Sequence, residues 1–209
     1  MEKNRITIKN VLAALLGVFF MAIGFAMNNR SGLGNDPVGI LYDGIRCALN
    51  LNAEQLGMAS NAVNITLVVL LFFLGRRYIS IGTLIYFIPY GTFVSIGNIM
   101  CDYLFHSETM VARIALSAAG CLILYLGIAI YIVVDIGTDP LTGLVLTVRD
   151  YTKKQYRIVK IAFDISLIIL GTVLGGTLGL VTIITGLLGG PVIQGYVNLI
   201  NRFAVGGRR

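Results

Sequence analysis

The sequence has 209 residues, of which 56% are hydrophobic and only 12% are charged, and its formal net charge is +6. Because a water-soluble domain carries about 25% charged residues, this composition excludes an ordinary soluble protein and predicts an integral membrane protein. The apolar runs are long and continuous, whereas a membrane β-barrel has alternating segments of about ten residues, so we expect an all-α protein. The basic residues flank the apolar runs, which argues against a nucleic-acid partner.

Six apolar runs follow one another along the chain, and each is predicted to cross the lipid bilayer, because about 20 apolar residues suffice for one crossing. An even number of crossings places both termini on the same side of the membrane. The predicted spans lie at 10–28, 57–74, 79–101, 112–134, 157–174 and 177–200.

The basic residues predict the orientation of these spans. Cytoplasmic loops carry an excess of Lys and Arg, and 13 of the 16 basic residues fall on the side of the termini. Only Arg30, Arg46 and Arg113 fall on the other side. We therefore expect cytoplasmic termini. The larger group consists of Lys3, Arg5, Lys9, Arg76, Arg77, Arg149, Lys153, Lys154, Arg157, Lys160, Arg202, Arg208 and Arg209.

The chain also repeats itself. The segment GLGNDPVGILYDGIR at 32–46 aligns without gaps on DIGTDPLTGLVLTVR at 135–149, so that Asp36-Pro37 matches Asp139-Pro140 and Arg46 matches Arg149. Glycines upstream and a Leu-Gly pair downstream match as well. Each half therefore contains one span, an Asp-Pro turn, a short segment and two more spans.

Three spans are an odd number, so two consecutive copies must enter the bilayer with opposite orientations. We expect a first repeat at 1–104 and a second at 105–209, arranged as in inverted-repeat transporters, whose binding site lies at the repeat interface near the bilayer midplane. The alternative is an old duplication that is kept for packing alone.

Each Asp-Pro pair predicts the start of a short helix, because Asp caps a helix N-terminus and Pro suits its first position. The predicted helices, 37–48 and 140–150, are about 16 to 18 Å long, too short for a hydrocarbon core of about 30 Å. They either re-enter the membrane partway or lie at its surface.

The function of these caps has two interpretations. Asp at the start and Arg46 or Arg149 at the end complement the helix dipole, and this structural role can be their whole purpose. Alternatively the N-termini also form a site, which suits an anionic group if their N–H groups are free. If the Asp side chains consume those N–H donors, the site favours a cation or a proton.

Asp164 is an acidic residue inside a predicted span, and its repeat mate is Asn64. Ionisable groups at membrane depth usually face a bundle interior or a cavity, which makes Asp164 a candidate for a substrate or proton role. The competing interpretation is that Asp164 reaches toward Lys160 or Arg157 in the cytoplasmic loop.

The third span of each half contains helix-breaking residues, Pro89 in the first and Gly189 to Pro191 in the second. We expect breaks at both places, because matching Gly and Pro interruptions in two repeats mark the site of a transporter.

No sequence motif points to an enzyme or to a cofactor. His106 is the only histidine, so a multi-histidine metal site cannot be built, and no phosphate-binding loop is present. We expect no enzymatic activity, no cofactor and no metal.

The segments GLGNDP and DIGTDP, together with residues 156–194, resemble the YczE/YitT-like bacterial membrane proteins, the YczE branch in particular. The similarity covers essentially the whole chain, with Asp164 where a Glu is common and Val181 where a Gly is common. It implies a duplicated, multi-pass protein of the bacterial inner membrane, and it implies no particular substrate.

The sequence thus predicts a secondary transporter or facilitator for a small polar solute, embedded in the lipid bilayer. The candidate site residues are Asp36, Asp139, Asn64, Asp164, Arg46, Arg149, Pro89, Gly189 and Pro191. The alternative is a non-transporting membrane protein whose basic loop at 149–160 recruits a cytoplasmic protein or lipid. A homodimer through glycine-rich faces is a further expectation.

Overall fold

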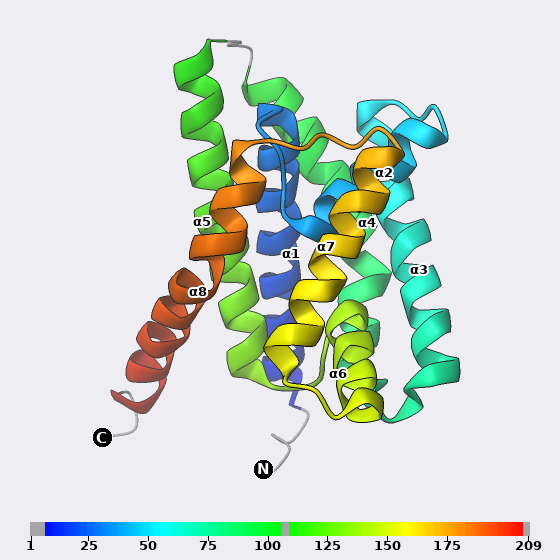
Figure 1. The fold of residues 1–209 in the computed structure, drawn as a ribbon. Helices are drawn as coiled ribbons and strands as arrows, with labels where there is room; N and C mark the ends of the chain where they lie inside the picture. Colours follow the sequence, from blue (N-terminus) through cyan, green and yellow to red (C-terminus); the bar gives the residue numbers. More distant parts are fainter. Residues whose placement is uncertain (1–6, 106–108, 207–209) are drawn as a thin grey trace.

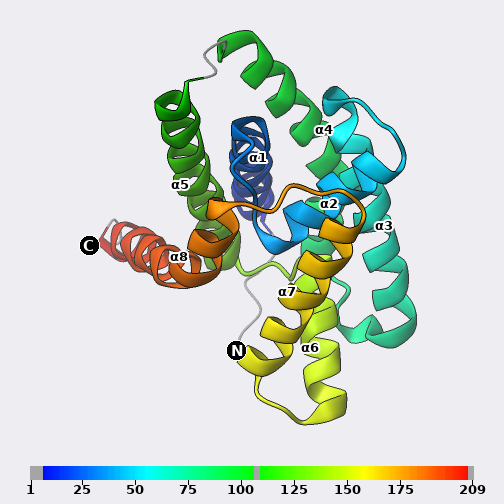
Figure 2. The same cartoon turned by 45° about the horizontal axis from the view of Figure 1, so that its top comes forward.

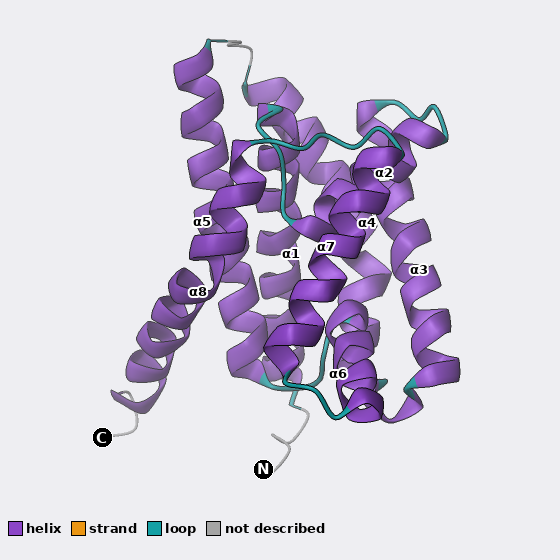
Figure 3. Cartoon of the chain, viewed as in Figure 1, coloured by secondary structure: helices purple, strands orange, loops and turns teal. Residues whose placement is uncertain are grey.

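The computed structural model describes residues 7–105 and 109–206, and His106 lies outside them. Each of the six predicted apolar runs forms a helix there, and no strand occurs in the described ranges (Figures 1 and 3). The long helices are α1 (Ile8–Ser31), α3 (Leu56–Leu74), α4 (Ile81–Leu104), α5 (Met110–Val134), α7 (Tyr156–Val173) and α8 (Leu180–Gly206).

Both predicted short helices are also present. They are α2 (Pro37–Ala48) and α6 (Pro140–Thr152), each with its proline in the first turn. Two single turns, at Ala53–Gln55 and Arg76–Tyr78, precede α3 and α4. In Figure 1 the connections before α2 and α6 turn back into the bundle, so that each short helix starts inside it and ends at its edge.

Four helices, α1, α3, α4 and α5, are long and apolar enough to cross a membrane, and α8 makes a fifth if its bent halves count as one span. Helix α7 carries Arg157, Lys160 and Asp164 within 18 residues, so its composition alone does not mark it as a span. The chain is a multi-pass membrane protein.

The predicted breaks in the third spans are only partly observed. Helix α4 continues through Pro89, so the break expected there is wrong. Asn61 of α3 accepts the N–H of Gly91 at 3.1 Å, two residues after Pro89, and a neighbouring helix that satisfies backbone groups makes such a proline tolerable. Helix α8 also continues through Pro191 but is bent by 54° between Leu180–Gly186 and Leu188–Arg202. That bend lies four residues before Pro191, where a proline ring clashes with the carbonyl of the preceding turn.

Helix α1 lies in the centre of the bundle, with α5 on one side and α4 on the other (Figure 2). Helices α1 and α5 run in opposite directions and cross at four glycines. A Cβ on Gly24 would lie 2.5 Å from the carbonyl oxygen of Gly120, and one on Gly127 would lie 2.5 Å from that of Gly17. Small residues permit this backbone contact, which side chains would prevent.

The short helices pack across the two halves of the chain. Helix α2 packs most extensively on α7, and α6 packs on α3 as well as on α7. Within the halves, α1 packs on α4, and its counterpart α5 packs on α8. Helix α3 also packs along α4, but α7 has no comparable contact with α8 in the described part of the chain. The arrangement is therefore symmetric except for the position of α8 relative to α7.

Candidate functional site

The two Asp-Pro turns have similar backbones but different caps. Asp139 accepts the N–H of Thr142 at 2.9 Å, which is a regular N-terminal cap. Asp36 occupies the equivalent position before α2, where its carboxylate faces the N–H of Gly39 without forming a capping hydrogen bond. Gly34 precedes it with a φ of +99°, a conformation that favours glycine. The cap of Asp139 consumes a donor that an anionic ligand would need.

Each turn contacts the start of the third long helix of the other half. The carbonyl oxygen of Leu33 accepts the N–H of Val181 at 3.0 Å, and that of Ile136 accepts the N–H of Gly82 at 3.3 Å. Leu33 and Ile136 are equivalent positions of the sequence repeat. These hydrogen bonds join the two halves at two related places.

A cluster of buried tyrosines lies between the two turns. Tyr86 and Tyr90 of α4 stack with a centroid separation of 4.9 Å, and Tyr42 of α2 lies 5.9 Å from Tyr90. Asp36 and Asp139 both lie within electrostatic reach of all three tyrosines. The negative charges of both Asp-Pro turns therefore reach this cluster.

Asn64 of α3, a candidate site residue from the sequence, contacts this cluster. Its Oδ1 accepts the hydroxyl of Tyr42 at 3.1 Å. Its Nδ2 is buried and has no hydrogen-bond partner in the described residues, and the same holds for the hydroxyl of Tyr131, whose ring contacts Tyr86. Leaving a buried donor unpaired costs about 1 to 3 kcal/mol, so these atoms are available to a polar ligand.

Helix α7 adds a charged pair. Lys160 forms an ion pair with Asp164, one helical turn further along, and their side chains remain 33% and 26% exposed. Both side chains lie within electrostatic reach of Asp36. Tyr156, one turn earlier on the same face, is influenced by Asp139. Asp164 thus reaches toward Lys160, as one of the two interpretations expects, and it also lies within electrostatic reach of Asp36.

At one end of the bundle a carboxylate connects the halves. Asp43 of α2 has a side chain only 4% exposed and pairs with Arg46 at 2.8 Å. Its other oxygen accepts both the N–H and the hydroxyl of Thr177, each at 2.9 Å, in the connection between α7 and α8. We call this the Asp43 latch.

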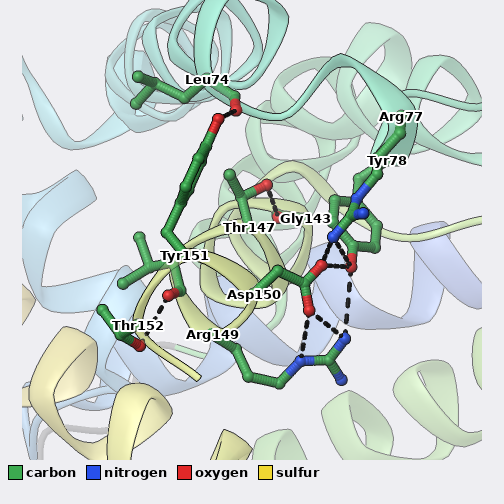
Figure 4. A network of polar contacts seen from close by, with 10 residues as sticks. Leu74, Arg77, Tyr78, Gly143, Thr147, Arg149, Asp150, Tyr151 and Thr152 are labelled. Atoms are coloured by element: carbon green, nitrogen blue, oxygen red, sulfur yellow. Dashed lines mark hydrogen bonds and ion pairs between the residues drawn. The ribbon is translucent and has the colours of Figure 1, made fainter. Parts of the chain in front are cut away.

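The opposite end has an equivalent connection, which we call the Asp150 latch (Figure 4). Asp150 of α6 accepts from Arg149 at 2.8 Å and also contacts Arg77 and the hydroxyl of Tyr78 in the turn between α3 and α4. Arg46 and Arg149 are repeat mates, and so are Arg77 and Thr177. Each short helix is thus attached to the turn before the last long helix of the other half.

The predicted site residues divide into three groups. Asn64 is hydrogen-bonded to Tyr42. Asp36 and Asp139 lie within electrostatic reach of the tyrosines, and Asp164 lies within electrostatic reach of Asp36. Arg46 and Arg149 lie in the two latches, as expected for residues at the far ends of the short helices.

The remaining predicted residues come from the third long helices. Pro89 lies next to Tyr90, whereas Gly189 approaches the Tyr125 ring of α5 and Pro191 is exposed. The structure therefore does not bring Gly189 and Pro191 into the cluster.

Sequence reasoning missed the tyrosines and both latch carboxylates. The signal for Tyr86 and Tyr90 was present, because two tyrosines four residues apart inside an apolar run share one helix face. Asp43 and Asp150 carry no such signal, since they are not repeat mates.

A bundle of apolar helices with half-length helices packed between its two halves defines a multi-pass membrane protein. The chain belongs to the family of unknown function DUF6198, whose pattern matches residues 8–198. An uncharacterised protein of Haemophilus influenzae is 26% identical over 194 residues, covering 93% of this chain and 86% of that protein. The uncharacterised protein YyaS of Bacillus subtilis is 21% identical over 188 residues, 90% of this chain and 92% of that protein. No solved structure matches.

Proposed function

We propose that this protein is a secondary transporter or facilitator, and not an enzyme, for a small polar solute whose path runs between two inverted repeats, residues 1–104 and 105–209. The observation that carries the proposal is that each half contacts the other near the tyrosine cluster. Helix α2 packs on α7, α6 packs on α3, and each Asp-Pro turn is hydrogen-bonded to a long helix of the other half. Inverted repeats with half-length helices place a binding site at their interface. The resemblance to YczE/YitT-like proteins supports the same duplicated architecture in the bacterial inner membrane.

The proposal includes six crossings with cytoplasmic termini. Helix α7 is the sixth span. Its Lys160 and Asp164 pair with each other, as intramembrane charges do, whereas Arg157 is exposed in the first turn of the helix. The start of α1 and the end of α8 lie at the same end of the bundle in Figure 1, which agrees with an even number of crossings.

The charges of the site favour a cationic solute or a proton. Asp36, Asp139 and Asp164 are three carboxylates against one ammonium group, that of Lys160, and the Asp139 cap removes a donor that an anion would use. The faces of the tyrosine rings add attraction for a cation.

Exchange of radiolabelled solutes in proteoliposomes tests the function, with a panel of small cationic, zwitterionic, anionic and neutral metabolites. We expect exchange of a cationic or zwitterionic member of the panel. Asp36→Asn and Asp139→Asn should each lower its rate at least about tenfold, because a hydrogen bond to a charged group contributes about 1.5 to 3 kcal/mol. Asparagine still caps a helix, so these variants should fold.

Asp102→Asn is the matched control, because Asp102 pairs with Arg30 at the exposed end of α4 and lies away from the cluster. We expect this variant to keep the wild-type rate. If folded wild-type protein exchanges no member of the panel, while a cytoplasmic protein co-purifies with it, the recruiting alternative replaces the transporter.

Labelling of single cysteines tests the inverted arrangement. In a chain whose three native cysteines are replaced by serine, Glu54→Cys follows α2 and Lys154→Cys follows α6, and both positions are exposed. We expect a membrane-impermeant maleimide to label Glu54→Cys in intact cells and Lys154→Cys only after permeabilisation. Labelling of both positions from the same side would refute the inverted repeat.

A further inference from the structure

A cavity of about 640 Å³ opens beside the Asp150 latch, between the turn that joins α3 to α4 and the end of α6. Its lining comes from both halves of the chain, and none of it belongs to the tyrosine cluster. The residues that matter here are Leu74, Arg76 and Arg77 from the first half, and Asp150, Tyr151 and Lys153 from the second.

The charges of this cavity are unbalanced. Its carboxylate, Asp150, is already engaged by Arg77 and Arg149. Arg76 and Lys153 form no ion pair with any described residue, so the cavity presents two cations without a counter-charge. A phosphate group carries the charge that would balance them.

Arg76 is held in place without a carboxylate. Its guanidinium lies over the ring of Phe72, 4.7 Å from the centroid, which is a cation–π contact. Lys153 ends α6 in a left-handed conformation with a φ of +58°. The Arg76 guanidinium is thus restrained at the cavity, where it can bind an anion with little loss of freedom, and Lys153 lines the same cavity from the end of α6.

An apolar surface adjoins the cavity. The last turn of α3 exposes Phe73 and Leu74, which are 78% and 51% accessible, and in a membrane protein such a surface contacts lipid tails. Tyr151 of α6 is 75% accessible, and its hydroxyl donates to the carbonyl oxygen of Leu74 at 3.2 Å. Exposed aromatic residues of this kind are enriched at the boundary between tails and headgroups.

We infer that this cavity binds the phosphate of an anionic phospholipid headgroup, with Arg76 and Lys153 as its ligands and the tails along Phe73 and Leu74. Basic pockets between helices at the membrane boundary recognise such headgroups. Because the cavity is lined by both halves, the bound lipid bridges them next to the Asp150 latch. This inference is independent of the transported solute.

Native mass spectrometry of the purified full-length chain in a neutral detergent tests the site. We expect the wild-type protein to retain phosphatidylglycerol in preference to phosphatidylcholine. The double variant Arg76→Gln/Lys153→Gln should bind phosphatidylglycerol at least about tenfold more weakly. The control Arg157→Gln/Arg202→Gln loses the same charge at exposed positions outside the cavity and should bind as the wild type does.

Several results would overturn the inference. One is a wild-type protein without preference for phosphatidylglycerol, a measurement that needs no variant. Another is an equal loss of binding in the control variant, which would indicate attraction by net charge alone. Full displacement of the lipid by inorganic phosphate at the same concentration would assign the cavity to a free anion instead.

Discussion

Replacement of Gly24 by alanine is expected to destabilise the protein by about 1 to 3 kcal/mol, the usual cost of overpacking. The new Cβ would lie 2.5 Å from both the carbonyl oxygen of Gly120 and the backbone nitrogen of Leu124. These are backbone atoms of α5, so only a shift of a whole helix can relieve the clash. The temperature of unfolding in detergent measures the effect.

Gly195→Ala is the control for this prediction. Gly195 lies in α8, and nothing is found within 4 Å of a Cβ placed there. Alanine favours a helix over glycine, so this variant should unfold at the wild-type temperature or slightly above it. If Gly24→Ala is as stable as Gly195→Ala, the backbones of α1 and α5 do not approach each other this closely.

The second large effect is expected at the two latches, and it follows from the proposed transport function, in which the two inverted repeats open the path to one side of the membrane at a time. Asp150→Asn should weaken the attachment of α6 to the α3–α4 turn and favour opening toward the cytoplasm. Asp43→Asn should weaken the attachment of α2 to Thr177 and favour opening to the outside. Each change removes charge-assisted contacts worth about 1.5 to 3 kcal/mol, so the populations should shift tenfold or more.

A single cysteine at Thr142, a partly exposed residue beside the Asp139 cap, can report these shifts in oriented vesicles. We expect faster labelling from the cytoplasmic side in Asp150→Asn and from the outside in Asp43→Asn. Asp102→Asn, which removes the surface pair with Arg30, should leave both rates unchanged. A shift in the same direction for both latch variants would contradict the gating role.

The positions of the helices could be predicted from the sequence because each depends on local information. Apolar runs fix α1, α3, α4 and α5, and the Asp-Pro pairs fix the first residues of α2 and α6. The glycines of the α1–α5 contact were visible as repeat mates, but their pairing depends on how the two helices cross. The contact of Asn61 with the α4 backbone near Pro89 was also hidden, because Asn61 belongs to another helix.

The candidate site was only half predictable for the same reason. Asp36, Asp139 and Asn64 were found from the repeat, since symmetric positions point to a shared interface. The Asp150 latch depends on Arg77 and Tyr78, which are more than 70 residues away in the chain, and the short α3–α4 turn gave no sign of its partner. Contacts between different helices are set by packing, which a single sequence does not display.

The way in which α2 and α6 pack across the halves has a consequence for how the chain becomes stable. The main packing partner of α2 is α7, and α6 lies against α3, so neither half can bury its own short helix completely. The packing of α2 is therefore complete only after the second half of the chain has been synthesised and α7 has inserted. Under the proposed inverted repeat, a single copy of this unit would need a second molecule inserted in the opposite direction to complete the same packing.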